Sequence, residues 1–482
     1  MSNPITRRAL LQQAAMLSTG AILPRALHAQ ATNATWITTT ESTPWQTTSF
    51  PKPAWHWDSL DLAVDLANPA QKIEGFGGCF NELGWTSLNA LTPEDRDHIL
   101  HDLFAPGVGT NFNLCRMPIG ANDFSRDWYS YDETPDDFSL QHFSIANDLE
   151  TLVPFIKSAQ HYNPSLQLWA SPWSPPSWMK RNHHYAAAPS FPGQPDNGLR
   201  PDQVGHEGTD MFLQEQRYFQ TYAAYFGRFI DAYKKQGIDI GMVMPQNEFN
   251  SAQPFPSSTW TPEGLARFIQ HLGPEMAGRH VRIFFGTLER GSVPLLETVL
   301  SDPQAGKFIE GVGVQWAGKN AVTEIHRRYP KLTIYQSEQE CGDGKNDWHY
   351  AAYCWDLMKH YFNSGANAYM YWNISLLEGG SSHWGWQQNS LVTVDPATRT
   401  YRFNHEYYLL KHVSHFVQPG ARRLPINGTF DNALAFQNPD RTIAVILRNE
   451  TSWPRTINIA LAGQKLFASM QPDSFNTLLL QS

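Results

Sequence analysis

The stretch Ile240-Gly241-Met242-Val243-Met244-Pro245-Gln246-Asn247-Glu248 is an apolar run that ends in polar side chains. Thr261-Pro262-Glu263 follows it and combines an N-cap threonine, a first-turn proline and an acidic first turn. These three features are typical of a helix N-terminus. The stretch therefore predicts a strand followed by a helix, with Asn247 and Glu248 at the C-terminal end of the strand.

The same strand-then-helix pattern repeats from about residue 72 to about residue 417. The eight strand candidates are Ile73–Phe80, Phe112–Ile119, Leu166–Trp173, Ile240–Glu248, Arg282–Leu288, Gly311–Trp316, Leu332–Glu338 and Asn367–Asn373. Thr92-Pro93-Glu94 is a second helix start, and Phe212–Lys235 and Trp348–Phe362 have apolar residues at helical spacing. Eight units over this length predict an α/β fold, a (β/α)₈ TIM barrel with insertions. The alternative is a doubly wound sheet, but no Gly-x-Gly-x-x-Gly turn follows the first strand.

The two ends of the chain differ from the barrel pattern. Residues from about 34 to 70 and from about 419 to 482 hold short alternating runs, such as Ala433–Gln437, Thr442–Leu447 and Arg455–Leu461, separated by turn residues. We expect a side β-sandwich built from both chain ends. The predicted boundaries are 32–70 and 418–482 for the two parts of the sandwich, and 71–417 for the barrel.

Composition and charge exclude several classes of protein. Of the 482 residues, 41% are hydrophobic and 13% aromatic, which is too much for a disordered or low-complexity chain. The formal net charge is −9 with no basic block, so we expect no nucleic-acid partner. Four cysteines are too few for a disulfide scaffold and match no zinc spacing.

The first residues resemble a sorting signal. Thr6-Arg7-Arg8-Ala9-Leu10-Leu11 is a twin-arginine pattern, a mostly apolar stretch follows it, and Ala29-Gln30-Ala31 offers a small-x-small cleavage site. The apolar stretch is shorter than the roughly 20 residues that span a bilayer. We therefore expect residues 1–31 to be a twin-arginine signal peptide and the mature protein to be periplasmic or secreted, without a stable membrane anchor. A surface helix with two arginines is the alternative.

The active site of a barrel of this type lies at the C-terminal ends of its strands. Polar and aromatic side chains gather at those ends: Arg116 and, in the loop beyond it, Asp123; Trp173 and Trp178; Asn247 and Glu248; Trp316; Glu338 and Glu340; Trp372 and Asn373. Glycosidic-bond cleavage needs two carboxyl groups, one to protonate the leaving oxygen and one to attack or to activate water. Tryptophans supply platforms for sugar rings, and Arg, Asp and Asn bond hydroxyl groups. The pattern predicts a carbohydrate substrate.

Several alternatives stay open at this point. Glu338 and Glu340 are two residues apart and so face the same side of a strand. Periodicity therefore cannot decide which of them is the catalytic carboxylate. Arg116 either contacts substrate or is a buried ion-pair partner of a carboxylate. His183-His184, in the long segment Ser174–Met211, favours a loop or substrate contact over a metal, and we expect no metal and no cofactor. A catalytically inactive carbohydrate-binding barrel is the alternative function; it would need one carboxylate missing, and both are present.

Eight short stretches along the barrel carry a family resemblance. They are Gln71-Lys72-Ile73-Glu74-Gly75-Phe76-Gly77-Gly78, Asp123-Phe124-Ser125, Glu133-Thr134-Pro135-Asp136-Asp137-Phe138, Ala170-Ser171-Pro172-Trp173, Trp178-Met179-Lys180, Asn247-Glu248, Ser337-Glu338 and Trp372-Asn373. In this order they resemble glycoside hydrolase family 30, in particular its glucosylceramidase-like branch. The resemblance implies a retaining β-glycosidase with a side β-sandwich. It assigns the acid/base role to Glu248 and the nucleophile role to Glu338.

The resemblance also implies that a set of residues shapes the sugar subsite, namely Asp123, Trp173, Asn247, Trp372 and Arg116. The chain differs from the glucosylceramidase-like branch at Gln315-Trp316-Ala317, where the pattern of that branch is His-Trp-Tyr. We expect this change to leave a wider, less basic rim, so the ceramide substrate is not carried over. Trp178, Trp316, Trp384 and Trp386 are candidates for apolar platforms beyond the first sugar. The alternative, for Trp384 and Trp386 above all, is that one or two of them pack the barrel rim. We therefore expect β-linked glucosides or related sugars as substrates, with oligosaccharides preferred and β-1,6-glucan as a candidate polymer.

Overall fold

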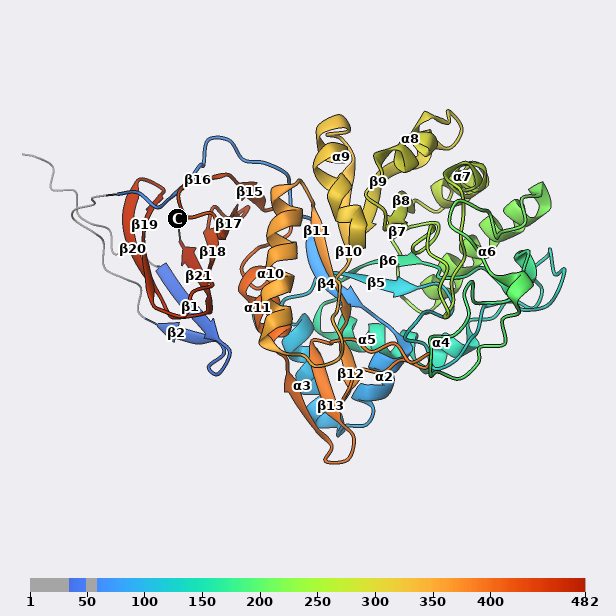
Figure 1. The fold of residues 1–482 in the computed structure, drawn as a ribbon, viewed down its shortest axis with the longest axis horizontal. Coiled ribbons are helices and arrows are strands. Elements are labelled where there is room, and N and C mark those ends of the chain that lie inside the picture. Colours follow the sequence, from blue (N-terminus) through green and yellow to red (C-terminus); the bar gives the residue numbers. More distant parts are fainter. Residues whose placement is uncertain (1–33, 49–58, 482) are drawn as a thin grey trace, which may run out of the picture.

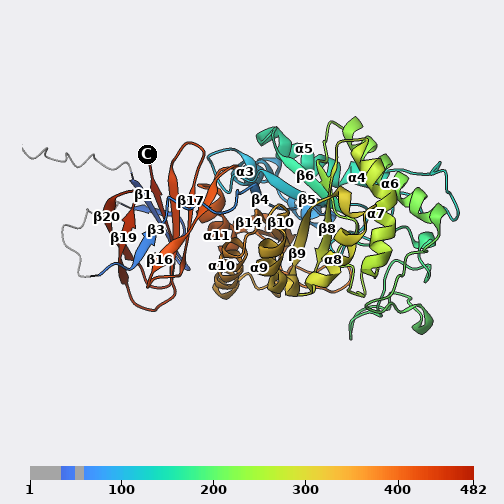
Figure 2. The ribbon, with the colours of Figure 1, turned by 90° about the horizontal axis from the view of Figure 1, so that it is seen from above.

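The computed structural model describes residues 34–48 and 59–481. The predicted signal peptide, residues 1–31, lies outside the described residues. The described chain forms a closed barrel with a β-sandwich lying beside it (Figure 1, Figure 2). Within the described part, no helix is both long and apolar enough to cross a bilayer.

Eight parallel strands close the barrel in the order β10-β11-β4-β5-β6-β7-β8-β9. Their bounds are β4 Gly75–Cys79, β5 Leu114–Pro118, β6 Gln167–Ser171, β7 Met242–Val243, β8 Arg282–Leu288, β9 Ile309–Gln315, β10 Thr333–Glu338 and β11 Ala368–Asn373. Each lies within or overlaps one of the eight predicted strands. The predicted TIM barrel is confirmed.

The strand β7 is much shorter than the predicted strand Ile240–Glu248. Pro245 has no N–H group and cannot donate to a ladder. The chain then turns, and Glu248 adopts a positive φ of 44°. The residues Gln246–Glu248 therefore belong to a turn at the rim of the barrel, which lifts the Glu248 side chain out of the strand's alternation.

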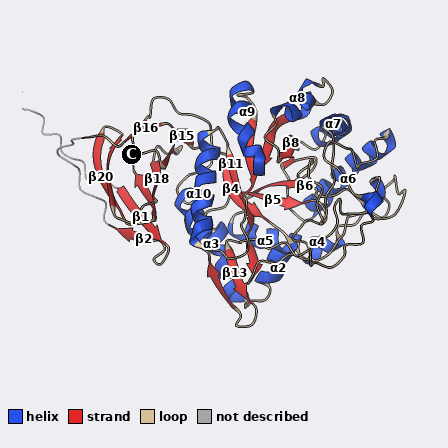
Figure 3. Cartoon of the chain, viewed as in Figure 1, coloured by secondary structure: helices blue, strands red, loops and turns tan. Residues whose placement is uncertain are grey.

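Helices surround the barrel (Figure 3). Their bounds are α2 Glu82–Leu88, α3 Pro93–Phe104, α4 Ala146–Glu150, α5 Leu152–Tyr162, α6 Gln216–Lys235, α7 Pro262–Ala277, α8 Val293–Ser301, α9 Val322–Arg328, α10 Trp348–Asn363 and α11 His405–Ser414. Both predicted helix starts are confirmed. Thr92 Oγ1 accepts a hydrogen bond from Asp95 N (3.2 Å), and Thr261 Oγ1 accepts one from Gly264 N (2.9 Å).

The interior of the barrel is filled by a compact apolar layer. Its buried members are Leu114, Trp169, Met242, Met244, Phe284, Tyr335, Ala368 and Met370. A second, larger cluster packs the outer faces of the strands against the helices. Because side chains close the barrel from below, polar groups at the C-terminal ends of the strands rest on a solid apolar floor.

The sandwich consists of two sheets, β15-β17-β18-β21-β1-β2 and β16-β3-β19-β20. The bounds are β1 Ala34–Thr40, β2 Gln46–Thr48, β3 Leu62–Val64, β15 Arg422–Leu424, β16 Ile426–Gly428, β17 Ala433–Gln437, β18 Ile443–Asn449, β19 Arg455–Leu461, β20 Gln464–Met470 and β21 Ser474–Leu480. Strand β1 pairs antiparallel with β21 along its whole length, from Ala34↔Leu480 to Thr40↔Ser474. The predicted sandwich built from both chain ends is confirmed.

One feature of the barrel did not follow from the sequence pattern. A three-stranded sheet of β12 Ser375–Leu377, β13 Val392–Asp395 and β14 Thr400–Phe403 follows β11. The long segment Ser174–Met211 is a loop, as its sequence indicates, and its helical elements are two short 3₁₀ helices, Ser177–Met179 and Pro201–Gln203. The fully buried Lys180 fixes this segment, because its Nζ donates to Ser174 Oγ, Tyr185 O and Ser257 O.

Candidate active site

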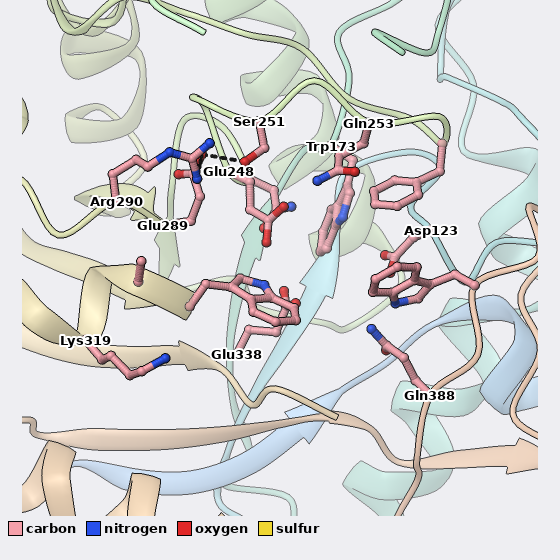
Figure 4. A pocket seen from close by; sticks show the side chains of 15 residues that line it. Asp123, Trp173, Glu248, Ser251, Gln253, Glu289, Arg290, Lys319, Glu338 and Gln388 are labelled. Carbon is pink, nitrogen blue, oxygen red and sulfur yellow. Dashed lines mark hydrogen bonds and ion pairs between the residues drawn. The ribbon is translucent and has the colours of Figure 1, made fainter. Parts of the chain in front are cut away.

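A cavity of about 540 Å³ opens at the C-terminal ends of the barrel strands (Figure 4). Its lining comes from the ends of β5, β6, β7, β8, β9 and β10 and from the segment between β12 and β13. It includes the predicted residues Asp123, Trp173, Asn247, Glu248, Trp316 and Glu338. It also includes Ala317, which we expected at the rim, and residues that sequence reasoning did not select: Ser251, Gln253, Phe255, Glu289, Arg290, Lys319 and Gln388.

Glu248 and Glu338 point into the same space from opposite sides of the cavity (Figure 4). Gln315 Nε2 lies 3.0 Å from Glu248 Oε1 and 3.2 Å from Glu338 Oε2. The gap between these two oxygens cannot exceed the sum of the two distances. A short gap between the nearest oxygens agrees with the carboxyl separation of about 5–5.5 Å that retaining glycosidases use.

Arg116 holds one end of this arrangement. Its Nη1 donates to Glu338 Oε2 (2.6 Å), its Nη2 to Asn247 Oδ1 (2.7 Å), and its Nε and Nη2 to Ser171 Oγ (3.3 and 2.9 Å). The guanidinium carbon also lies 4.4 Å from the centre of the Trp173 ring. Arg116 is completely buried, so it orients the carboxylate and the amide from behind the cavity wall.

Two tryptophans form one wall of the site. Trp173 lines the cavity and stacks on Trp372, with ring centres 5.2 Å apart at 29°. Trp372 is fully buried and is not part of the lining. Trp173 thus presents its ring to the cavity and Trp372 supports it from beneath. On the same side of the site, Asp123 is buried, and its Oδ1 has no hydrogen-bond partner among the described residues.

Burial controls the protonation of the carboxyl groups. It raises the pKa of Asp123 to about 7, and the charge of Glu248 adds to the effect. Burial also raises the pKa of Glu248, against the hydrogen bond from Gln315 and the charge of Arg116. Burial raises the pKa of Glu338 well above its usual range, the charges of Glu248 and Asp123 add to the effect, and the direct ion pair with Arg116 opposes it. One buried arginine thus faces three carboxyls, and protons remain in the site near neutral pH.

Glu289 is a further buried carboxyl in the cavity lining. Its Oε1 accepts hydrogen bonds from Asn250 N (2.8 Å) and Ser251 Oγ (2.9 Å), in the turn that carries Glu248. Burial raises the pKa of Glu289 to about 8. Glu289 directly follows the predicted strand Arg282–Leu288, so the strand-end rule could have found it.

Glu340, the alternative to Glu338, lies outside the cavity lining. Its Oε1 accepts from Lys319 Nζ (2.7 Å) and its Oε2 accepts from Tyr353 OH (2.6 Å). Glu340 therefore forms an ion pair with Lys319. Of the two, only Lys319 lines the cavity.

The four tryptophans expected beyond the first sugar divide into two groups. Trp316 and Trp386 line the cavity. Trp178 and Trp384 do not, and for them the expectation is wrong. Trp178 is buried and its Nε1 donates to Asp132 O (2.9 Å). The indole N–H of Trp384 points to Tyr185 OH (3.3 Å). Both fill the packing beneath the rim loops, which the sequence pattern could not distinguish from a cavity wall.

The histidine pair of the long loop carries no metal site. His184 Nε2 lies 3.0 Å from Asn197 O, and its Nδ1 accepts from Ala186 N (3.0 Å). Across residues 34–48 and 59–481, no group of three or more His, Cys, Asp and Glu side chains is placed to hold a metal ion.

Comparison with known proteins places these features in a family. The model of the glycosyl hydrolase family 30 TIM-barrel domain matches residues 73–417, and that of the family 30 beta sandwich domain matches residues 420–478. The lysosomal acid glucosylceramidase of Mus musculus is 29% identical, covering 82% of this chain and 78% of that protein. The endo-1,6-beta-D-glucanase neg1 of Aspergillus fumigatus is 27% identical, covering 87% and 88%.

Solved structures show the same fold. SrfJ from Salmonella typhimurium superposes with a TM-score of 0.82 at 23% identity, covering 93% of this chain and 99% of that one. An endo-beta1,6-glucanase superposes with a TM-score of 0.78 at 23% identity, covering 93% and 100%.

Proposed function

The chain belongs to glycosyl hydrolase family 30 and is a glycoside hydrolase, and on that premise we propose that it hydrolyses β-linked glucosides or related sugars with retention at the anomeric carbon. Glu248 is the general acid/base and Glu338 the nucleophile. The observation that carries the assignment is the pairing of these two carboxyls around Gln315 Nε2, at the ends of β7 and β10. Retaining enzymes need carboxyls about 5–5.5 Å apart, and the shared donor supports a short separation.

Arg116 decides which carboxyl attacks. Its direct ion pair favours the ionised form of Glu338, whereas no cation among the described residues hydrogen-bonds to Glu248. Glu338 therefore attacks the anomeric carbon while Glu248 gives its proton to the departing glycosidic oxygen. A covalent glycosyl ester forms and the alcohol leaves. Glu248, now ionised, takes a proton from water, which displaces Glu338 and releases the sugar.

Asp123 and Asn247 are placed to bind the hydroxyls of the sugar being transferred. Asp123 lines the cavity and its carboxyl can accept a hydrogen bond from a sugar hydroxyl, and Trp173 offers a flat face for the sugar's C–H groups. In Figure 4, Asp123 and Gln388 lie to one side of the carboxyl pair, and Arg290 and Lys319 lie to the other. We assign the first side to the transferred sugar and the second to the leaving group.

The leaving-group side favours an oligosaccharide over a lipid. Ser251, Glu289, Arg290 and Lys319 line it with hydrogen-bonding groups. A ceramide would leave these groups unpaired on binding, whereas a second sugar can bond them. The family includes relatives of both kinds, a glucosylceramidase and an endo-1,6-beta-D-glucanase. The polar lining supports β-1,6-glucan as a candidate polymer.

The test is a substrate screen with a stereochemical readout. The panel holds β-1,6-glucan, glucosylceramide in detergent, and aryl β-glycosides of glucose, galactose, fucose and xylose. We expect cleavage of β-1,6-linked oligosaccharides, with the β-anomer appearing first by NMR. An inverted first product contradicts the mechanism. Cleavage of glucosylceramide alone contradicts the substrate class. Binding without turnover of any substrate favours an inactive carbohydrate-binding barrel.

We also propose that the protein is exported through a twin-arginine route. The support is the sequence alone: Arg7-Arg8, the apolar stretch after it and Ala29-Gln30-Ala31. Fusing residues 1–31 to a reporter that is active only outside the cytoplasm tests this. We expect activity with the native segment and none with Arg7→Lys/Arg8→Lys. Equal activity of both fusions would contradict the proposal.

A further inference from the structure

Gln315 lies behind the two carboxyls and uses its whole amide group in hydrogen bonds. Its Nε2 is 3.0 Å from Glu248 Oε1, 3.2 Å from Glu338 Oε2 and 3.3 Å from Asn247 Oδ1. Its Oε1 accepts a hydrogen bond from Ser337 Oγ (2.8 Å). A flipped amide would aim its oxygen at both carboxyls, so these contacts define its orientation. The side chain is completely buried and is not part of the cavity lining.

We propose that Gln315 is a positioning residue, which holds the two carboxyls at their working separation and adds no charge between them. This inference rests on the proposed function, because it assumes that Glu248 and Glu338 carry the reaction. It assigns a role to a position where the chain departs from the His-Trp-Tyr pattern of glucosylceramidases. It also corrects the expectation that Gln315 belongs to the rim, because the residue lies beneath the site.

The charged groups around the pair explain why a neutral donor suits this position. Arg116 on β5 already pairs with Glu338, and Arg290, after β8, pairs with Glu207 at 3.0 Å. The acids Asp123, after β5, and Glu289, after β8, also face the cavity, as does the cation Lys319, which pairs with Glu340. Burial keeps the thiol of Cys79 on β4 neutral by raising its pKa.

A second cation between the carboxyls would favour the ionised form of both. Glu248 would then lose the proton that it must deliver to the leaving oxygen. The amide of Gln315 stabilises whichever carboxyl is ionised by a hydrogen bond alone. It can therefore serve both halves of the reaction, in which the charge moves from Glu338 to Glu248.

Because Gln315 does not reach the cavity, its loss should affect the chemical step more than binding. We expect Gln315→Met to lower kcat roughly 100-fold, the cost of a carboxyl displaced by about 1 Å, with KM changed less than about threefold. Losing a donor to the ionised carboxyls raises their pKa values. The acidic limb of the kcat/KM profile should therefore move up by about one pH unit.

Gln315→His should shift the basic limb of the kcat/KM profile, and in the opposite direction, toward lower pH. A protonated imidazole adds a cation and lowers the pKa of Glu248, so the basic limb should move to lower pH than in the native enzyme. The matched control is Gln336→Met, which removes another fully buried barrel glutamine whose Oε1 accepts from Met370 N (2.7 Å). Its pH limbs should coincide with those of the native enzyme.

The inference is overturned if Gln315→Met has the kcat and the pH limbs of the native enzyme. It is also overturned if only KM rises, because that result indicates a substrate contact. If Gln315→Met does not fold, the basic limb of Gln315→His decides, and an unmoved limb overturns the inference. Glu248→Gln and Glu338→Gln separate the two levels of argument. If both retain activity the proposed function is wrong; if both lose it and Gln315→Met does not, only the positioning role is wrong.

Discussion

Arg116 Nη1 lies 2.6 Å from Glu338 Oε2, and both side chains are buried. A buried ion pair of this kind has two consequences. The positive charge stabilises Glu338 as a carboxylate, the form in which a nucleophile must exist before attack. The arginine also depends on the glutamate, because a buried cation without its partner is strongly unfavourable. The pair therefore links activity to stability in this protein, and each can be tested separately.

The nucleophile assignment predicts an asymmetry between Glu338 and Glu340. Glu338→Ala should lower kcat at least about 1000-fold, because the covalent step is lost. Azide or formate, added to an activated aryl glycoside, should partly restore turnover by occupying the vacated space. Glu340→Ala is the control. It removes a partner of Lys319 and Tyr353 outside the cavity, and kcat should stay within about tenfold of native. Rescue of Glu340→Ala in place of Glu338→Ala would reverse the assignment.

The ion pair predicts a stability effect that a second mutation relieves. Arg116→Met removes the cation and leaves Glu338 buried and unpaired, which should reduce the free energy of unfolding by about 3–5 kcal/mol. Arg116→Met/Glu338→Gln removes the stranded charge as well. We expect the double variant to be more stable than Arg116→Met alone, measured by urea unfolding at pH 7. If the stability losses of Arg116→Met and Glu338→Gln add up to the loss of the double variant, the two side chains are not energetically coupled.

The barrel and the two carboxyls could be predicted from the sequence because both depend on local signals. Apolar runs that end in polar residues mark strand ends, and parallel strands in a barrel bring those ends together. Glu248 and Glu338 therefore converge although they are far apart in the chain. The helix starts at Thr92 and Thr261 were predictable for the same reason, since a cap is read from three neighbouring residues.

The remaining features depend on contacts between distant segments. Nothing next to Gln315 in the sequence indicates that its amide lies between two carboxyls on other strands. Trp386 lines the cavity, whereas Trp384 hydrogen-bonds to Tyr185. This difference depends on how the long loop packs on the rim. The strand end at Glu289 followed the same rule as Glu248, but its partners Asn250 and Ser251 appear only in the folded turn.

The stacked rings of Trp386 and Phe191 predict a subsite beyond the first sugar. Their centres lie 5.5 Å apart at 24°, and Trp386 lines the cavity. Trp386→Ala should lower kcat/KM for β-1,6-linked oligosaccharides about tenfold, through lost aromatic contact, and leave an aryl β-glucoside unaffected. Trp453→Ala, an exposed tryptophan of the sandwich, is the control and should change neither substrate. An equal loss on both substrates would place Trp386 at the first sugar instead.

A buried acid outside the cavity lining predicts a pH-dependent stability. Glu406 on α11 is buried, and its Oε1 accepts from Asn389 Nδ2 (2.8 Å). Burial raises the pKa of Glu406 to about 7. Between the usual glutamate pKa of 4.5 and about pH 7, the folded chain keeps a proton that the unfolded chain releases. The free energy of unfolding therefore falls as the pH rises through this interval. Glutamine mimics the protonated acid and removes this loss.

We expect Glu406→Gln to match the native protein at about pH 5 and to exceed its free energy of unfolding by roughly 2–3 kcal/mol at about pH 8. Other buried acids contribute the same slope to both proteins, so the difference between the two curves isolates Glu406. Glu310→Gln, at the one exposed position of β9, is the control, and its curve should run parallel to the native one. Urea unfolding at four pH values between 5 and 8 provides the measurement. Parallel curves for Glu406→Gln and the native protein would show that Glu406 is ionised in the fold throughout this range.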